Sequence, residues 1–305
     1  MIFHECNSIP LFSLATNLRA KFVLEKLNTN ITDPDTINSL YHPGLSVPLN
    51  LFSFKLYDEI PKPTDITAVD CKKHLFALEQ FFSNPSSISN SSELKPLTSL
   101  RNRIETEVSH INSFAVRVKD ALSHLKNYAP NNWKRINFLI KEIIPLSTKN
   151  RIISKSKVGR GSSAIYYCGG IFIDPPENVD EDEELIQLLM NIVHEAGHQA
   201  MYILQSTDNL ALDANQTVYS PIRKTDRPIL KSIHAIAAIS GMILLCEELL
   251  DKDLWSVKSK DIVHRHYKEL KANLLLGLSG LKDKELTEIG QMTCRYWYAM
   301  AMRSA

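Results

Sequence analysis

The stretch that most constrains this chain is residues 185–204, an apolar run at helical spacing that contains the motif His-Glu-x-x-His. On a helix, residues four positions apart lie on one face, one turn apart along the axis. His194 and His198 can therefore bind one first-row transition metal between two imidazoles, with Glu195 beside them. The pentapeptide alone is unspecific, because it also arises by chance.

Two neighbouring features favour a metal site over chance. The turns before the first histidine are apolar, with Leu188, Leu189, Ile192 and Val193. They predict a buried helix, in which two unpaired imidazoles would cost stability. An acidic run at residues 180–184 precedes the helix, and negative charge is favourable at a helix N-terminus. We therefore predict that His194 and His198 bind a metal.

Composition narrows the compartment and the class of partner. The chain has 305 residues, 44% hydrophobic and 23% charged, with a net charge of +1. This balance is typical of a soluble globular protein and gives no electrostatic case for nucleic acid or an anionic membrane. The five cysteines are widely spaced and form no Cys-x-x-Cys pair, and the first residues do not resemble a signal peptide; both features predict a cytoplasmic protein. The sequence has no long uninterrupted apolar window, so we expect no membrane span.

Hydrophobic periodicity predicts a mainly helical α+β fold with a small sheet next to the metal helix. We expect an N-terminal region of helices and loops over residues 1–92 and a metal-binding catalytic region over 93–305; one continuous domain is the alternative. Besides the metal helix, helices are predicted over 97–128, 131–144, 228–250, 259–279 and 282–303. Strands are predicted over 151–157 and 163–174, separated by a turn at 159–163.

The identity of a third metal ligand decides the chemistry. The metzincin pattern requires a histidine six residues after His198, but Leu204 occupies that position. A gluzincin-type glutamate is absent until Glu247 and Glu248. The intervening stretch holds one histidine, His234, in the most apolar predicted helix, where a buried imidazole needs a partner.

His234 and Glu248 are exclusive alternatives as ligands, because fourteen residues of helix separate them by roughly 21 Å. We favour His234. Three neutral imidazoles leave the full charge of a divalent ion, which favours a bound hydroxide or an anionic bidentate co-substrate.

Arg227 lies seven residues before His234, which on a continuous helix is two turns, or about 10 Å, along the same face. An arginine there can bind the far carboxylate of a small diacid whose near end chelates the metal. The alternative is an arginine that pairs with a loop carboxylate such as Asp226.

The order of motifs in residues 150–250 resembles a known family. Gly-Ile-Phe-Ile-Asp-Pro at 170–175 precedes His-Glu-Ala-Gly-His at 194–198, and Tyr-Ser-Pro-Ile-Arg at 219–223, Arg-Pro at 227–228 and Ile-His-Ala at 233–235 follow. This order is similar to that of the HExxH-type peptide-modification proteins found beside ribosomal peptide natural-product precursors, whose members are described as Fe(II)- and 2-oxoglutarate-dependent peptide β-hydroxylases. Ile222 departs from the family, which usually has an aromatic residue there.

The resemblance implies that His194, His198 and His234 bind Fe(II), and that Arg227 or Arg223, with Ser220, binds 2-oxoglutarate. The implied partner is a precursor peptide, hydroxylated at a side-chain β carbon. Glu195 would then orient a ligand or contact substrate instead of acting as a base.

Two other classes stay open. One is a zinc metallopeptidase, with Glu195 as the general base and Glu247 or Glu248 as third ligand. The other is a non-catalytic protein that uses a metal-containing or degenerate site to bind a peptide. In every case we expect the peptide to add as a strand beside residues 165–172, as at the edge of a sheet.

Overall fold

The computed structural model describes residues 103–104, 107–140, 142–147, 161–163, 169–176, 180–205, 208–220, 225–252 and 256–303. The described part is mainly helical, with 70% of its residues in helices, and has two small sheets, which confirms the coarse α+β prediction. Its helices are α5 (Val108–Tyr128), α6 (Pro130–Leu139), α7 (Glu181–Gln205), α8 (Ile229–Leu250), α9 (Val257–Ser279) and α10 (Glu288–Met302). The predicted N-terminal region, 1–92, and the predicted strand 151–157 lie outside the described residues.

Helix α7 carries the motif and forms as the sequence predicts. The Asp180 side chain accepts a hydrogen bond from the Glu183 backbone N–H at 3.2 Å, so it caps the helix start. Four acidic residues occupy the first turn, where their negative charges interact favourably with the positive end of the helix dipole. Most of the helix between Ile186 and Leu204 is buried. The helix that carries the motif therefore lies in the protein core.

Three short strands form a mixed sheet in the order β1-β3-β2. The central strand, β3 (Gly170–Ile173), is fully buried; it pairs in parallel with β1 (Glu142–Pro145) and antiparallel with β2 (Gly161–Ser162). The predicted helix over 131–144 is therefore too long. Helix α6 stops at Leu139, because the following apolar residues pair with β3 instead of completing another turn.

Two further boundaries differ from the sequence prediction. The predicted helix over 97–128 is interrupted: Arg103 is helical, Ile104 forms an isolated bridge with Leu146 beside the sheet, and α5 begins at Val108. The last helix begins at Glu288 instead of residue 282. Its cap explains the start, because the Thr287 side chain accepts a hydrogen bond from the Gly290 backbone N–H.

A two-stranded antiparallel hairpin, β4 (Thr217–Ser220) and β5 (Thr225–Pro228), was not predicted. The polar, proline-containing sequence lacks a continuous strand pattern, yet burial alternates along β4 as in a half-buried strand. Helix α8 begins at Ile229, directly after the hairpin. Arg227 therefore lies in β5, and the prediction that it extends the face of α8 is wrong.

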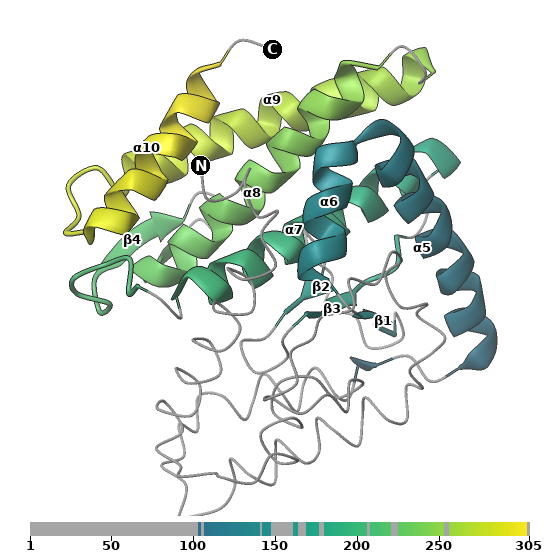
Figure 1. Ribbon diagram of the computed structural model, residues 1–305, viewed down its shortest axis with the longest axis horizontal. Helices are drawn as coiled ribbons and strands as arrows, with labels where there is room; N and C mark the ends of the chain where they lie inside the picture. The colour runs from purple at the N-terminus through teal and green to yellow at the C-terminus, as the bar shows by residue number, and fades with distance from the viewer. Residues whose placement is uncertain are drawn as a thin grey trace, which may run out of the picture.

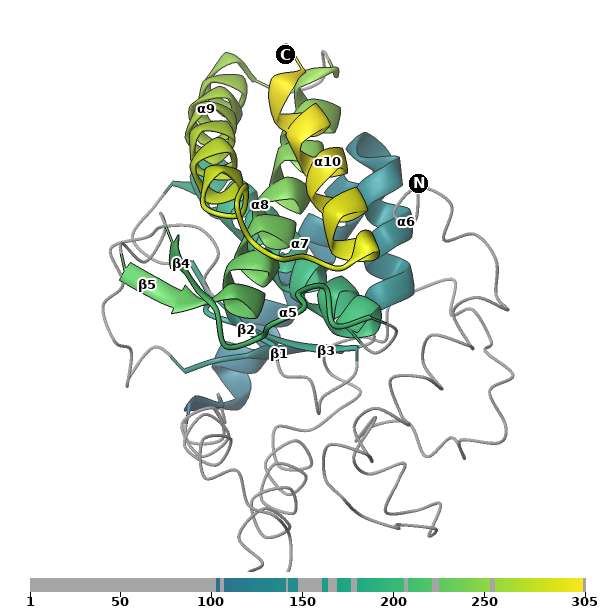
Figure 2. The same ribbon diagram turned by 90° about the vertical axis from the view of Figure 1, so that its left-hand side faces the viewer.

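Helix α8 runs through the middle of the helical layer, packed against α7 on one side and α9 on the other. Figure 1 shows α6 and α7 above the three-stranded sheet and α5 running alongside it past the level of the strands, and Figure 2 shows the hairpin beside the start of α8. Helix α7 contacts both β2 and β3. Within the described residues, α8 is the helix whose length and composition would also suit a membrane crossing. Most of that stretch is buried inside the protein, as expected of a core helix.

Gly197 permits the close approach of α7 and α8. A Cβ at this position would lie 2.7 Å from the Ala238 Cα, which is backbone and cannot move aside alone. We expect Gly197→Ala to destabilise the fold by about 1–3 kcal/mol through overpacking, more than the roughly 0.5–1 kcal/mol gained in helix propensity. Gly280→Ala is the matched control, because its nearest atom would be 3.4 Å away. Urea unfolding midpoints compare the two; equal midpoints would contradict the packing argument.

Candidate metal centre

The helical spacing of the motif places its two histidines side by side on α7. The Nε2 atoms of His194 and His198 are 3.1 Å apart, and the Glu195 Oε1 is 3.9 Å from the His194 Nε2. Donor atoms of these three residues all lie within 4.8 Å of one another. The sequence prediction that one turn of helix brings both imidazoles together is confirmed.

His234 reaches the same cluster from α8. Its Nδ1 is 3.4 Å from the His198 Nδ1, and its Nε2 lies 2.9 Å from the Gln205 Oε1. If the Nε2–H donates to this carboxamide, the Nδ1 of the neutral ring carries no proton and can accept a hydrogen bond or bind a cation. His198 presents its Nε2 to His194 and its Nδ1 to His234. One ring cannot offer both nitrogens to a single ion, so ligation by all three residues requires an imidazole ring to turn.

The protonation state of His198 suits a ligand. Burial, and to a smaller extent the positive charge of Arg227, together lower the pKa of His198 to about 4. The imidazole is therefore neutral across the physiological pH range, and it does not have to lose a proton before it binds a cation.

Glu195 is buried against the sheet. A Cβ on Gly161 of β2 would lie 2.9 Å from the Glu195 Oε1, so a glycine is required where the carboxylate meets this strand. Within the described residues the Glu195 Oε2 has no hydrogen-bond partner. Burial raises the pKa of Glu195 to about 8; the Ser163 hydroxyl opposes this rise and the Asp174 carboxylate adds to it. A buried, unsatisfied carboxyl oxygen beside two imidazoles fits a nearby cation, whose charge would favour the ionised form.

The raised pKa of Glu195 predicts the pH dependence of the metal-free protein. In the unfolded chain this carboxyl ionises near 4.5, but in the fold it ionises near 8. The folded state holds the extra proton between these values, so stability falls as pH rises from about 4.5 to 8. At about 1.4 kcal/mol per pKa unit, the loss is on the order of 3–5 kcal/mol.

The stability of the Glu195→Gln variant should depend much less on pH. The measurement is the free energy of unfolding in urea at pH 5, 6.5 and 8, for wild type and variant after chelator treatment. The Asp226→Asn variant is the control, because Asp226 is exposed on β5. Parallel pH profiles for wild type and Glu195→Gln would show that Glu195 does not titrate in this window.

The glutamates proposed for a gluzincin-type site are used elsewhere. Glu248 accepts hydrogen bonds at 3.1–3.2 Å from the backbone N–H groups of Asn131 and Asn132 and from the Asn132 side chain, at the start of α6. Glu247 accepts from the Tyr267 hydroxyl at 3.3 Å. The group of donor atoms formed by His194, Glu195 and His198 contains neither glutamate, and it does not contain His234 either, although the His234 Nδ1 lies 3.4 Å from the His198 Nδ1. The contacts of Glu247 and Glu248 therefore do not support either glutamate as the third ligand.

The residues predicted to bind a co-substrate are only partly described. Val218 and Arg227 are directly opposite one another in the hairpin, so their side chains lie on one face, and Ser220, two residues along β4, shares it. Ser220 is buried, and its hydroxyl has no hydrogen-bond partner among the described residues. Arg223 lies outside the described residues.

The strand expected to border the site is central and does not form an edge. β3 pairs with β1 along its length and with β2 at Phe172 and Ile173. A peptide strand therefore cannot pair with Phe172, which has a strand on each side; residues 165–168 of the predicted docking strand lie outside the described part. Gln199 attaches α7 to this strand, since its Oε1 accepts from the Gly169 N–H and its Nε2 donates to the Gly170 carbonyl.

Sequence reasoning missed two residues that position the cluster. Gln205 bonds His234, and the Tyr202 ring lies 4.7 Å from the His234 ring. Their spacing was a usable signal, because Tyr202 is four residues and Gln205 seven residues beyond His198, on the same helical face.

No known protein-family model and no curated protein sequence matches the chain. The fit of a metal therefore depends on the donor set itself. Two nitrogens that each lie about 2.1 Å from one ion are roughly 3.0–3.4 Å apart at ordinary coordination angles. The separation of 3.1 Å between His194 and His198 falls in this range. Neutral imidazoles suit iron and zinc alike.

Proposed function

We propose that this protein is an Fe(II)- and 2-oxoglutarate-dependent oxygenase that hydroxylates a side-chain β carbon of a ribosomally made peptide. His194, His198 and His234 would hold the iron, and Arg227 or Arg223, with Ser220, would hold the co-substrate. The observation that carries the proposal is the cluster of imidazoles: the Nε2 atoms of His194 and His198 are 3.1 Å apart, and the His234 Nδ1 is 3.4 Å from the His198 Nδ1. Arg227, on the hairpin that leads directly into the helix of His234, is the cation that a diacid bound to the metal would need.

The chain's own residues divide the work. Gln205 fixes the tautomer of His234, so that the Nδ1 is available as a ligand. Arg227, half-buried on β5, can pair with the far carboxylate of 2-oxoglutarate, and the buried hydroxyl of Ser220 lies on the same face of the hairpin. When bound, Fe(II) and 2-oxoglutarate supply, with O2, the oxidising power for hydroxylation of a C–H bond.

Burial of the site serves the same reaction. His194 and His198 are partly covered, and Glu195 is almost fully enclosed by α7 and β2. Such enclosure keeps water from the reacting atoms and holds the substrate carbon in place. In this proposal Glu195 positions a ligand or the substrate.

A zinc metallopeptidase is the second candidate, and the proximity of Glu195 to the histidines favours it. A carboxylate 3.9 Å from the His194 Nε2 can act as general base for a metal-bound water. Its third ligand would then also have to be His234, because Glu247 and Glu248 are used elsewhere. A non-catalytic metal-containing peptide-binding protein is the third class; a metal without an open coordination position would distinguish it.

Glu195→Gln separates the two enzyme classes. A peptidase that loses its general base should lose roughly 100- to 10,000-fold in rate. The oxygenase should retain both metal and 2-oxoglutarate binding in this variant, and the wild type should not cleave peptides. The measurement is hydrolysis of unblocked peptides by metal-loaded wild type and Glu195→Gln under nitrogen. Oxygen-independent cleavage that depends on Glu195 would replace the oxygenase proposal by the peptidase.

A further inference from the structure

The imidazole of His234 contacts one face of the helix that carries the motif. His234 is buried, and its ring lies against His198, Tyr202 and Gln205 of α7. Tyr202 and Gln205 follow His198 by four and seven positions, so the three side chains lie on the same helical face. The orientation of the His234 ring therefore depends on this face of α7.

Gln205 distinguishes the two ring nitrogens of His234. The Gln205 Oε1 lies 2.9 Å from the His234 Nε2, and a carboxamide oxygen can only accept a hydrogen bond. This contact is favourable only when the Nε2 carries the proton, which leaves the Nδ1 without one. The same Nδ1 lies 3.4 Å from the His198 Nδ1, on the side of the metal centre.

Tyr202 limits the rotation of the same ring. The centroids of the Tyr202 and His234 rings are 4.7 Å apart, with an angle of 53° between the planes. The Tyr202 hydroxyl donates to the Ser163 carbonyl at 3.2 Å, directly after β2. The tyrosine is therefore attached at both ends, to α7 through its backbone and to the chain beside the sheet through its hydroxyl.

A half-turn of the His234 ring about its Cβ–Cγ bond would exchange the Nδ1 for the Cδ2 and the Nε2 for the Cε1. One carbon would then face the Gln205 Oε1, another would face His198, and a buried hydrogen bond would be lost. His198 is held differently. In the described part of the chain, its nitrogens contact the imidazoles of His234 and His194 and no carboxamide or carbonyl. His198 is therefore free to turn when an ion binds, whereas His234 is fixed.

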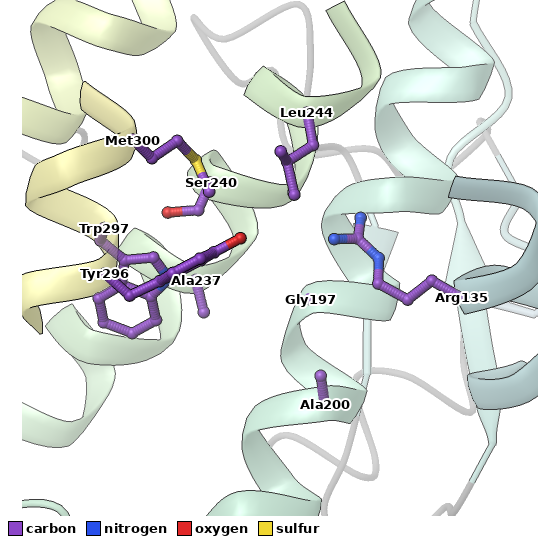
Figure 3. A pocket seen from close by; sticks show the side chains of 10 residues that line it. Arg135, Gly197, Ala200, Ala237, Ser240, Leu244, Tyr296, Trp297 and Met300 are labelled. Carbon is purple, nitrogen blue, oxygen red and sulfur yellow. The ribbon is translucent and has the colours of Figure 1, made fainter. Parts of the chain in front are cut away.

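The other side of α7 does not contribute to the histidine cluster. Gly197 and Ala200 line a narrow space between α6, α7, α8 and α10, and Trp297 of α10 lies across from them (Figure 3). No histidine is among the residues that line this space. Exposed positions of α10 therefore offer controls for variants that face the cluster.

We propose that Tyr202 and Gln205 are positioning residues of the metal centre, which hold His234 so that it binds the ion through its Nδ1, whereas His194 binds through its Nε2. The inference rests on the ligand set of the proposed function, His194, His198 and His234. It concerns neither the identity of the native metal nor the co-substrate, so zinc can test it separately from oxygenase chemistry.

The first test titrates Zn(II) into the full chain with isotope-labelled histidine rings, and long-range proton–nitrogen NMR follows both nitrogens of each ring. The signals of His234 are assigned by their loss in His234→Gln. We expect the His234 Nδ1 to take the chemical shift of a metal-bound nitrogen while the Nε2 keeps its proton, and His194 to show the opposite pattern. Zinc bound through the His234 Nε2 would overturn the inference and leave the three-histidine ligand set intact. A His234 ring that does not respond to zinc, while His194 responds, would overturn the inference and the ligand set together.

The second test removes each positioning contact, with zinc affinity measured by competition with a chelating dye. Loss of a residue that orients a ligand typically costs about 10- to 100-fold in metal affinity, which is the loss expected for Gln205→Leu. Tyr202→Leu should weaken binding in the same direction. Gln205→Glu should retain the affinity because a carboxylate accepts the same hydrogen bond, and Tyr202→Phe should retain most of it because the ring remains. Gln291→Leu and Tyr298→Leu, at exposed positions of α10, are the matched controls.

The tautomer of His234 separates positioning from a general loss of stability. In metal-free Gln205→Leu we expect both neutral tautomers of His234, whereas the control variants keep the proton on the Nε2. Zinc affinities of Gln205→Leu and Tyr202→Leu equal to that of wild type would overturn the proposal. A loss that Gln205→Glu and Tyr202→Phe share would also overturn it, because the effect would then be one of packing. If a leucine variant fails to fold, the NMR pattern of the wild-type chain still decides.

Discussion

Replacing His234 by alanine is expected to abolish tight binding of Fe(II), although His194 and His198 remain 3.1 Å apart on the same helix. His234 is the described imidazole that approaches this pair from another element, with its Nδ1 turned toward His198 and its Nε2 held by Gln205. Loss of a residue that only orients a ligand costs about 10- to 100-fold in metal affinity, so loss of a ligand should exceed about 100-fold. Elemental analysis of purified, anaerobically reconstituted variants measures the metal content.

Glu248→Ala is the control for this prediction. Glu248 accepts three hydrogen bonds at the start of α6, so its loss should lower the stability and leave the metal content near that of wild type. Normal metal content in His234→Ala would remove His234 from the ligand set. Normal content in His234→Ala, combined with loss in Glu195→Gln, would assign the third ligand to the carboxylate nearest the two histidines.

Replacing Arg227 by alanine is expected to weaken 2-oxoglutarate binding without loss of iron. The predicted interaction is a charge-assisted pair in a partly desolvated place, and the loss of one partner typically costs about 2–5 kcal/mol, or roughly 30- to 4,000-fold in affinity. Arg227→Lys keeps the charge but loses the planar fork, so it should be impaired as well. Iron binding should survive, since a guanidinium has no acceptor atom and cannot be a metal ligand. Calorimetric titration of 2-oxoglutarate into the iron-loaded variants under nitrogen measures the co-substrate affinity, and the iron content of the same samples shows whether the metal is retained.

Arg223→Ala is the comparison for this experiment, because the resemblance assigned the co-substrate to either arginine. A large loss in Arg223→Ala with unchanged affinity in Arg227→Ala would transfer the role to Arg223. Unchanged affinity in both variants would leave the proposed co-substrate without a protein anchor.

The parts of the fold that follow a strong helical period were predictable. Residues 185–204, 228–250 and 259–279 appear as α7, α8 and α9 with boundaries that shift by a few residues. The meeting of His194 and His198 followed from helix geometry alone. The position of His234 next to these two residues depends on how α8 packs against α7. The sequence favoured His234 as a ligand only because no other histidine lies between Gln199 and Cys246.

The parts that failed depend on pairing between distant segments. The apolar residues Ile143 and Ile144 would suit either a buried helix or a buried strand. Their parallel pairing with β3 is what makes this segment a strand. The hairpin β4-β5 moved Arg227 from a predicted helix face to a strand. The capping role of Glu248 also depends on a contact more than one hundred residues away in the chain. No local pattern contains this information.

Anaerobic addition of Fe(II) and 2-oxoglutarate to the purified protein decides whether the histidine cluster binds both together. We expect a weak visible charge-transfer band that requires both the metal and the co-substrate and that is lost in His198→Ala. The same band should reach its full intensity in Arg227→Ala only at much higher 2-oxoglutarate concentration, while the Asp226→Asn control, on the neighbouring exposed position of β5, behaves as wild type. A protein that binds Fe(II) at the histidines but gives no band at saturating 2-oxoglutarate would contradict the proposed chemistry.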